Sequence, residues 1–150
     1  MMSVLQKRAR IRQEYLRLAE EFIQAVSSRI PVAAAAVIGS VARGDFSDAS
    51  DIDVVIISDG LPADLLARSA MLYADVPPRI EPKAYTKPEF LGMLSKKNPL
   101  AVATLKEGVV LVDSGGFLKA LATGKGSEPT TSNKQTKCPG GPELQASEKR

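Results

Sequence analysis

Two aspartates at alternating positions are the residues of this sequence best suited to chemistry. Asp51 and Asp53 stand directly before the apolar run at 54–57, and that run predicts a strand that begins at the acids. A strand points every second side chain to the same face, so the two carboxylates lie roughly 6.5 to 7 Å apart along the chain. Magnesium prefers hard oxygen ligands and commonly takes one or two carboxylates together with phosphate oxygens. The pair therefore indicates a site for a metal-nucleotide complex.

A glycine and a hydroxyl group precede the acids. Gly39 and Ser40 follow the short apolar run at 33–38, which predicts a buried strand that ends in a turn. A residue without Cβ lets backbone N–H groups approach a phosphate, and the serine hydroxyl can add a hydrogen bond. A phosphate cradle and an acid pair on adjacent strand ends together predict a site for a nucleoside triphosphate.

Basic residues near these elements have two interpretations each. Arg43 could form a charge-assisted contact with the same phosphates, or it could pair with Asp45 or Asp48 in the loop. The basic positions at 7–17 predict a solvated helix face, with contact to nucleic acid or to an acidic partner as the alternative.

Composition limits the class of protein. The 150 residues, 44% hydrophobic and 25% charged, suffice for one globular domain with a core. No apolar run approaches the roughly 20 residues of a membrane span, and basic residues interrupt the N-terminal segment, so we expect a cytoplasmic protein without membrane contact. The net charge of +3 is concentrated in the last 27 residues, and the remainder holds 15 basic against 14 acidic residues. A body so close to neutral argues against nucleic acid as the main partner.

Histidine is absent, and the only cysteine is Cys138. This excludes disulfides, structural zinc, Cys-His nucleophiles and Ser-His-Asp triads. Any chemistry must therefore use carboxylates, hydroxyls, amines and bound metal ions.

Helix and strand patterns interleave along the chain. Apolar spacing, prolines and capping signals predict helices at 5–30, 62–74, 86–97, 99–107 and 117–122, and strands at 33–38, 52–58, 79–85 and 109–112. Pro82 cannot donate a ladder hydrogen bond, which favours an edge position or a short pairing for the third strand. In the helix at 62–74 the residues expected to face inward are Leu65, Leu66, Ala70 and either Leu72 or Tyr73. The order of elements predicts an α/β (α+β) fold, a mixed β-sheet with helices packed on it.

The predicted organisation has three parts. Residues 1–30 form an N-terminal helix that belongs to the domain, residues 31–122 form the domain itself, and residues 123–150 form a polar tail. The tail has almost no large apolar side chains, so it cannot offset the entropy of ordering, and we expect it to be disordered.

The string GSVARGDFSDASDIDVVII resembles the signature of the DNA polymerase beta-like nucleotidyltransferase superfamily, in which a Gly-Ser pair is followed by ten residues and then Asp-x-Asp. It is most similar to the minimal nucleotidyltransferases related to the kanamycin nucleotidyltransferase domain, and the resemblance covers most of residues 30–113. It implies the palm fold of these enzymes.

The resemblance also implies roles for individual residues. In the superfamily the paired acids bind two magnesium ions, a third acid on a neighbouring strand helps to activate the attacking hydroxyl, and the serine contacts the triphosphate. Carried over, the catalytic and metal-binding acids are Asp51, Asp53 and Glu81, and Ser40 joins Gly39 and Arg43 as the nucleotide-binding residues. The third acid is more often aspartate, and a proline follows it here, so Glu81 has the alternative of being an ordinary exposed strand residue.

The implied reaction is the transfer of AMP from ATP to a hydroxyl. The acceptor attacks the α-phosphorus in line and pyrophosphate leaves, with two metal ions stabilising the entering and departing oxygens. The palm and its helices use up the body, so we expect another molecule to present the hydroxyl. Small members of this family are often encoded beside an all-helical HEPN-domain protein and act as antitoxins that modify the toxin, which implies a HEPN-type partner.

Two alternatives stay open beside this enzyme. The first is a weak or inactive nucleotide-binding module that neutralises its partner by binding. The second is a nucleotidyltransferase that acts on a small molecule or on nucleic acid, which a basic groove beside Asp51 would favour.

Overall fold

The structure is a computed structural model that describes residues 2–47, 49–74 and 76–123 of the chain. In chain order the elements are α1 (Val4–Ser27), β1 (Ala34–Ile38), α2 (Gly39–Arg43), β2 (Ile52–Ile57), α3 (Leu65–Tyr73), β3 (Ile80–Tyr85), α4 (Lys87–Ser95), α5 (Pro99–Glu107), β4 (Val109–Asp113) and α6 (Phe117–Ala122). Each predicted helix and strand has a counterpart here. The short helix α2 was not expected, because a Gly-Ser pair after a strand predicts a turn.

The four strands form one mixed sheet in the order β3-β2-β1-β4. β1 is antiparallel to β2 and β4, whereas β2 is parallel to β3. The connection through α3 is what allows the parallel pairing. The predicted edge position of the strand that contains Pro82 is confirmed, since β3 lies at one side of the sheet. The mixed sheet with helices packed on it confirms the predicted fold class.

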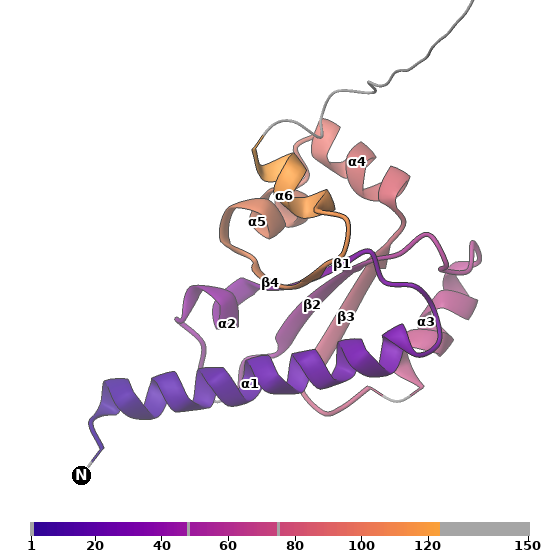
Figure 1. Ribbon diagram of the computed structural model, residues 1–150. Coiled ribbons are helices and arrows are strands. Elements are labelled where there is room, and N and C mark those ends of the chain that lie inside the picture. The colour runs from indigo at the N-terminus through magenta and orange to yellow at the C-terminus, as the bar shows by residue number, and fades with distance from the viewer. Residues whose placement is uncertain (1, 48, 75, 124–150) are drawn as a thin grey trace, which may run out of the picture. The chain divides into compact units, whose positions relative to one another are not determined.

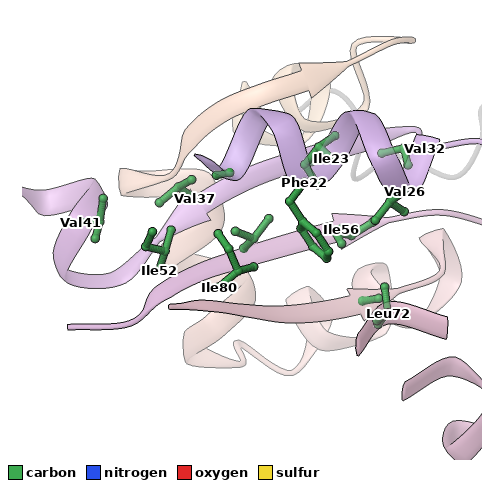
Figure 2. Packing of buried hydrophobic residues seen from close by; sticks show 14 of the residues in the cluster. Phe22, Ile23, Val26, Val32, Val37, Val41, Ile52, Ile56, Leu72 and Ile80 are labelled. Atoms are coloured by element: carbon green, nitrogen blue, oxygen red, sulfur yellow. The ribbon is translucent and has the colours of Figure 1, made fainter. Parts of the chain in front are cut away.

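One face of the sheet packs against α1 (Figure 1). Phe22, Ile23 and Val26 of α1 lie in one cluster of buried side chains with Val37 of β1 and Ile56 of β2 (Figure 2). Each of these residues is at most 2% exposed, and burying such a side chain stabilises the fold by about 1.5 to 3 kcal/mol. This packing explains why apolar residues recur along α1 at steps of three and four.

The opposite face of the sheet packs against α5 (Figure 1). Gly108, the residue directly after α5, lies close to the sheet, because a Cβ at this position would be 3.4 Å from the Cβ of Ala36 in β1. With helices on both faces, every residue of β1 is buried, and so is every residue of β2 except Asp53. Asp53 therefore lies where the apolar core gives way to solvent.

The prediction of which α3 side chains face inward is wrong for Leu65, Leu66 and Ala70. These three side chains and that of Tyr73 are exposed. Leu72 is buried, as one of the two alternatives had it, and so is Arg68, four residues before it. A charged residue can take this inward position because its guanidinium donates to a carboxylate of α4 and to two backbone carbonyls.

Caps determine where α3 and α4 begin. The side chain of Asp64 accepts a hydrogen bond from the backbone N–H three residues later, so α3 starts after it and Pro62 lies before the helix instead of in its first turn. The predicted capping box of α4 is confirmed. The backbone N–H of Thr86 donates to Glu89 at 2.9 Å, and the backbone N–H of Glu89 donates to the hydroxyl of Thr86 at 3.3 Å.

The chain divides into two compact units, Met1–Phe117 and Leu118–Arg150. The first unit contains the sheet and α1 to α5. Residues 124–150 lie outside the described residues, and with them most of the predicted tail and Cys138, so the boundaries expected at 31, 122 and 123 stay predictions. In the described part of the chain, no helix combines the length and the apolar character that crossing a bilayer requires.

Candidate active site

Asp53 and Glu81 face each other across the parallel strands β2 and β3. Their Cα atoms are direct partners in the ladder, so both side chains lie on the same face of the sheet, on strands about 4.8 Å apart. On its other side, Asp53 is the partner of Ile38, the last residue of β1. The side chains of Asp53 and Glu81 are 29% and 47% exposed. The structure thus brings two of the three predicted acids together, within reach of solvent, at the end of the sheet where β1 stops.

Gly39 lies against the carboxylate of Asp53. Its φ of +78° is in the left-handed region, and a Cβ at this position would lie 2.7 Å from Oδ2 of Asp53. Both the backbone conformation and the close approach therefore require glycine. Ser40 follows in the first turn of α2, half-buried, and its hydroxyl has no hydrogen bond to any residue that the structure describes.

Asp51 lies one residue before β2 and is exposed. Its carboxylate forms no ion pair with any described residue. The next residue is held in place, because the N–H of Ile52 donates to the carbonyl of Arg79 at 2.6 Å. Among the residues described, no three acids come near enough to one another to hold a metal ion. The structure therefore brings Asp53 and Glu81 together, but it does not bring Asp51 into one cluster with them.

Lys83 lies between the two facing carboxylates. Its Nζ is 3.2 Å from Oε2 of Glu81 and 3.4 Å from Oδ1 of Asp53. Partial burial disfavours the charged ammonium, but the hydrogen bond with Glu81 and the charges of both acids outweigh this effect, so the pKa of Lys83 is raised above its ordinary value. Lys83 is not among the predicted site residues. The available signal was its position two residues after Glu81 in a strand, which places both side chains on the same face.

The donor set fits a divalent cation that shares its ligands with a nucleotide. Asp53 and Glu81 supply two carboxylates that already enclose a cation, the ammonium of Lys83. Magnesium commonly binds to one or two carboxylates and completes its octahedron with phosphate oxygens and water. Among the described residues no third His, Cys, Asp or Glu joins these two carboxylates in a group that could hold a metal ion.

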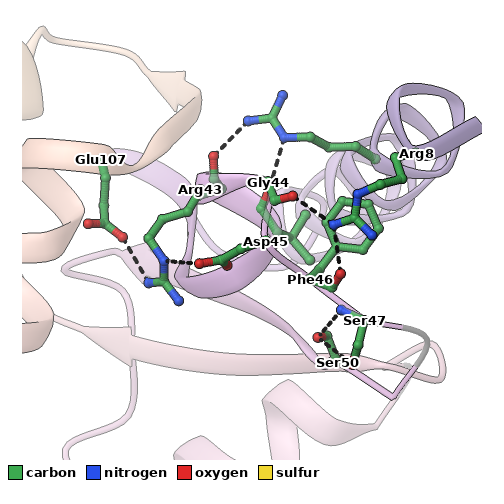
Figure 3. Close-up of polar contacts among 11 residues, drawn as sticks. Arg8, Arg43, Gly44, Asp45, Phe46, Ser47, Ser50 and Glu107 are labelled. Atoms are coloured by element: carbon green, nitrogen blue, oxygen red, sulfur yellow. Dashed lines mark hydrogen bonds and ion pairs between the residues drawn. The ribbon is translucent and has the colours of Figure 1, made fainter. Parts of the chain in front are cut away.

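Arg43 pairs with acids of the protein itself (Figure 3). Its Nε lies 3.2 Å from Oδ2 of Asp45, and its Nη1 lies 3.0 Å from Oε2 of Glu107 at the end of α5. Pairing within the loop was one of its two interpretations. The side chain of Arg43 is 48% exposed, and ion pairs at exposed positions contribute little to stability, so a polyphosphate could replace them. A phosphate contact for Arg43 stays a prediction, and Asp48 lies outside the described residues.

Two arginines of α1 hold α2 and the loop that follows it. Arg12 donates two hydrogen bonds of 2.8 Å to carbonyls of α2. Arg8 donates two of 2.8 Å to the carbonyls of Gly44 and Phe46, and its guanidinium lies 4.6 Å from the centroid of the Phe46 ring (Figure 3). The last carbonyls of so short a helix have no partners within it, so the arginines satisfy them. The expected solvated face at 7–17 is therefore wrong at these two positions.

Comparison with known proteins identifies the family of this chain. The family profile described as nucleotidyltransferase domain matches residues 19–112, which run from within α1 into β4. The chain belongs to the nucleotidyltransferase domain family. The matched segment contains Gly39, Ser40, Asp51, Asp53 and Glu81, together with Lys83.

A solved structure agrees with this nucleotidyltransferase fold. The crystal structure of a provisionally assigned nucleotidyltransferase from Sulfolobus solfataricus, at 1.40 Å resolution, superposes with a TM-score of 0.53 and 22% sequence identity, over 69% of this chain and 84% of that one. At this identity the likeness concerns the fold. No curated protein is significantly similar to the chain.

Membership in the family makes the protein an enzyme of nucleotidyl transfer. Nucleotidyltransferase domains take a nucleoside triphosphate as substrate and work with a divalent metal ion. The family assignment leaves the nucleotide, the acceptor and the roles of individual residues to be proposed from the geometry.

Proposed function

We propose that the protein is a magnesium-dependent nucleotidyltransferase that transfers AMP from ATP to a hydroxyl of a HEPN-type partner protein, as an antitoxin would. The observation that carries the proposal is the position of Asp53. It faces Glu81 across the parallel strands and lies against Gly39, which precedes the serine of α2. A carboxylate pair and a Gly-Ser segment at one end of a sheet suit the binding of a triphosphate with its metal ion.

The chain's own residues have separate tasks in this reaction. Asp51, Asp53 and Glu81 are the proposed metal ligands, and Ser40 and Arg43 the proposed contacts to the phosphates. The hydroxyl oxygen of the acceptor forms a bond to the α-phosphorus, the bond from that phosphorus to the bridging oxygen of the β-phosphate breaks, and pyrophosphate leaves. Glu81 is the proposed acceptor of the hydroxyl proton. Bound metal ions would neutralise charge on the phosphates during this transfer.

Exposed apolar side chains support a protein as the acceptor. Leu65 and Leu66 of α3 are 68% and 81% exposed, and Tyr73 is 50% exposed. Leu65 and Tyr73 border a cavity of about 720 Å³ that is also lined by residues of β3 and α4. Adjacent exposed leucines beside a cavity are typical of a surface that a partner covers. Pro82 and Ala84, which line this cavity, alternate with Glu81 along β3 and so lie on the other face of the sheet, and a partner would have to reach around this edge strand to present its hydroxyl.

Transfer of labelled nucleotide tests the proposal. We would incubate the protein with Mg²⁺ and ATP labelled at the α-phosphate, with and without the protein encoded by the neighbouring reading frame. We expect the partner to gain the label and the mass of one adenylate group. Asp53→Asn should abolish transfer while the circular dichroism spectrum is unchanged. Asp59→Asn is the matched control, because the one hydrogen bond of the Asp59 side chain to a described residue is accepted from the N–H of Lys87, and an asparagine oxygen also accepts it.

Undiminished transfer by Asp53→Asn would show that Asp53 takes no part in the reaction, and this would contradict the proposed active site. Loss of transfer in the Asp59→Asn control would show that the assay responds to general damage. A partner without a helical fold would remove the HEPN-type part of the proposal only.

A second candidate is a nucleotide-binding module with weak or no turnover, which neutralises its partner by binding. The observation that favours it is Lys83, whose ammonium lies between the two acids. A partner that binds tightly and never gains label, while ATP binding is normal, would select this candidate.

A further inference from the structure

Lys83 forms its two ion pairs among the described residues with Asp53 and Glu81. It lies two residues after Glu81 on β3, and its Cα partner on β2 is the apolar Val55. The side chain is 26% exposed, so its stem packs along the sheet while the ammonium turns back toward the acids. Two contacts of 3.2 and 3.4 Å hold the ammonium there, one to each carboxylate.

An ammonium in this position does part of what a metal ion would do. It places one positive charge between two carboxylates that lie directly opposite each other on neighbouring strands, where like charges destabilise the pairing. A divalent cation at the same position would use the oxygen atoms that the ammonium contacts, Oδ1 of Asp53 and Oε2 of Glu81. It therefore competes with the ammonium for these two atoms and is repelled by its charge.

We propose that Lys83 is a built-in competitor for the divalent cation at Asp53 and Glu81, so that its charge lowers the affinity of the protein for free metal ions. This inference rests on the proposed function, since it takes the two acids as metal ligands. Removing the ammonium exposes two unneutralised carboxylates, which should bind a divalent cation more tightly. The same removal leaves the metal-free protein with two repelling charges and should lower its melting temperature.

The test is a calorimetric titration of Mn²⁺ into the full chain without nucleotide. We expect Lys83→Met to bind Mn²⁺ at least about 10-fold more tightly than wild type, because the substitution removes a positive charge that lies a few ångströms from the cation. Lys83→Arg keeps the charge and should stay close to wild type. Lys96→Met is the matched control, because Lys96 is an exposed lysine of the cavity between α3 and α4 and lies away from the acids.

Thermal denaturation gives a second readout that needs no activity. The metal-free Lys83→Met protein should melt at a lower temperature than wild type, and saturating Mn²⁺ should raise its melting temperature by more than it raises that of wild type. If Lys83→Met does not fold, Lys83→Gln replaces it, and we expect the same lower melting temperature without metal and the same larger increase with Mn²⁺.

Equal or weaker Mn²⁺ binding by Lys83→Met, with binding still weakened by Asp53→Asn, would overturn the role of Lys83 and leave the proposed function intact. Absence of Mn²⁺ binding in wild type and in both uncharged Lys83 variants, even with ATP present, would instead overturn the metal site itself and both proposals. Tighter binding by Lys96→Met to the same extent would also overturn the inference, because the effect would then follow from net charge.

Discussion

Replacing Gly39 with alanine tests the close approach between the Gly-Ser segment and Asp53. The left-handed φ of +78° costs a residue with a Cβ about 1 to 2 kcal/mol. The new methyl group would also lie 2.7 Å from Oδ2 of Asp53, so the carboxylate must shift, which adds about 1 kcal/mol at the lower end of overpacking. We therefore expect Gly39→Ala to lower the free energy of unfolding by about 2 to 3 kcal/mol. Gly44→Ala is the matched control, because Gly44 has a φ of +92° and an added Cβ would have no atom of the described residues within 4 Å.

Urea denaturation measures the loss of stability in both variants, and titration with Mn²⁺ shows whether the carboxylate of Asp53 has moved. The control should lose only the backbone cost of about 1 to 2 kcal/mol and should bind Mn²⁺ as wild type does. Gly39→Ala should lose more stability and bind Mn²⁺ more weakly. Equal losses of stability, together with unchanged Mn²⁺ binding in both variants, would refute the close approach as a cause.

Two further predictions concern polar contacts away from the acids. Arg12→Met removes a charged donor from two carbonyls of α2 and should lower the free energy of unfolding, measured in urea, by about 1 to 3 kcal/mol. The control Arg10→Met changes an exposed side chain and should alter this free energy by less than about 0.5 kcal/mol. Equal free energies of unfolding for the two variants would contradict a stabilising role for the Arg12 contacts. The pKa of Glu89 is lowered, first by the hydrogen bond from Arg68 and then by the backbone N–H of Thr86. Its contribution to stability is therefore present above the unfolded value of 4.5 and is lost as the pH falls through the lower folded pKa. Urea denaturation across this acid range should show a shallower loss of stability for Glu89→Gln than for wild type, and equal slopes would contradict it.

The elements that carry the acids could be predicted because their signals are local. The strands on both sides of the Gly-Ser segment are apolar runs bounded by Pro31, Gly39 and Gly60, and runs of this length fit a buried strand better than a helix. The capping box of Thr86 and Glu89 is likewise complete within four residues. Signals of this kind do not depend on how distant segments meet.

The contacts that complete the site depend on the meeting of distant segments. Lys83 reaches Asp53, 30 residues earlier, only because β2 and β3 pair in parallel with Asp53 opposite Glu81. A shift of this pairing by one residue would turn one of the two acids to the other face of the sheet. No local pattern determines that register. The inward face of α3 was missed for a related reason, since the burial of Arg68 depends on acceptors from other segments.

Lys83 also determines which measurement can separate the two candidate functions. Two carboxylates opposite each other on neighbouring strands repel, and a protein without a cation between them would lose stability. Because Lys83 supplies that cation, the fold does not require a metal ion to keep Asp53 and Glu81 together. A stable metal-free protein is therefore expected both of an active transferase and of a binding module. Label transfer to the partner separates the two, and the affinity of the Lys83→Met variant for Mn²⁺ shows whether the acids can bind the metal ion that the transfer needs.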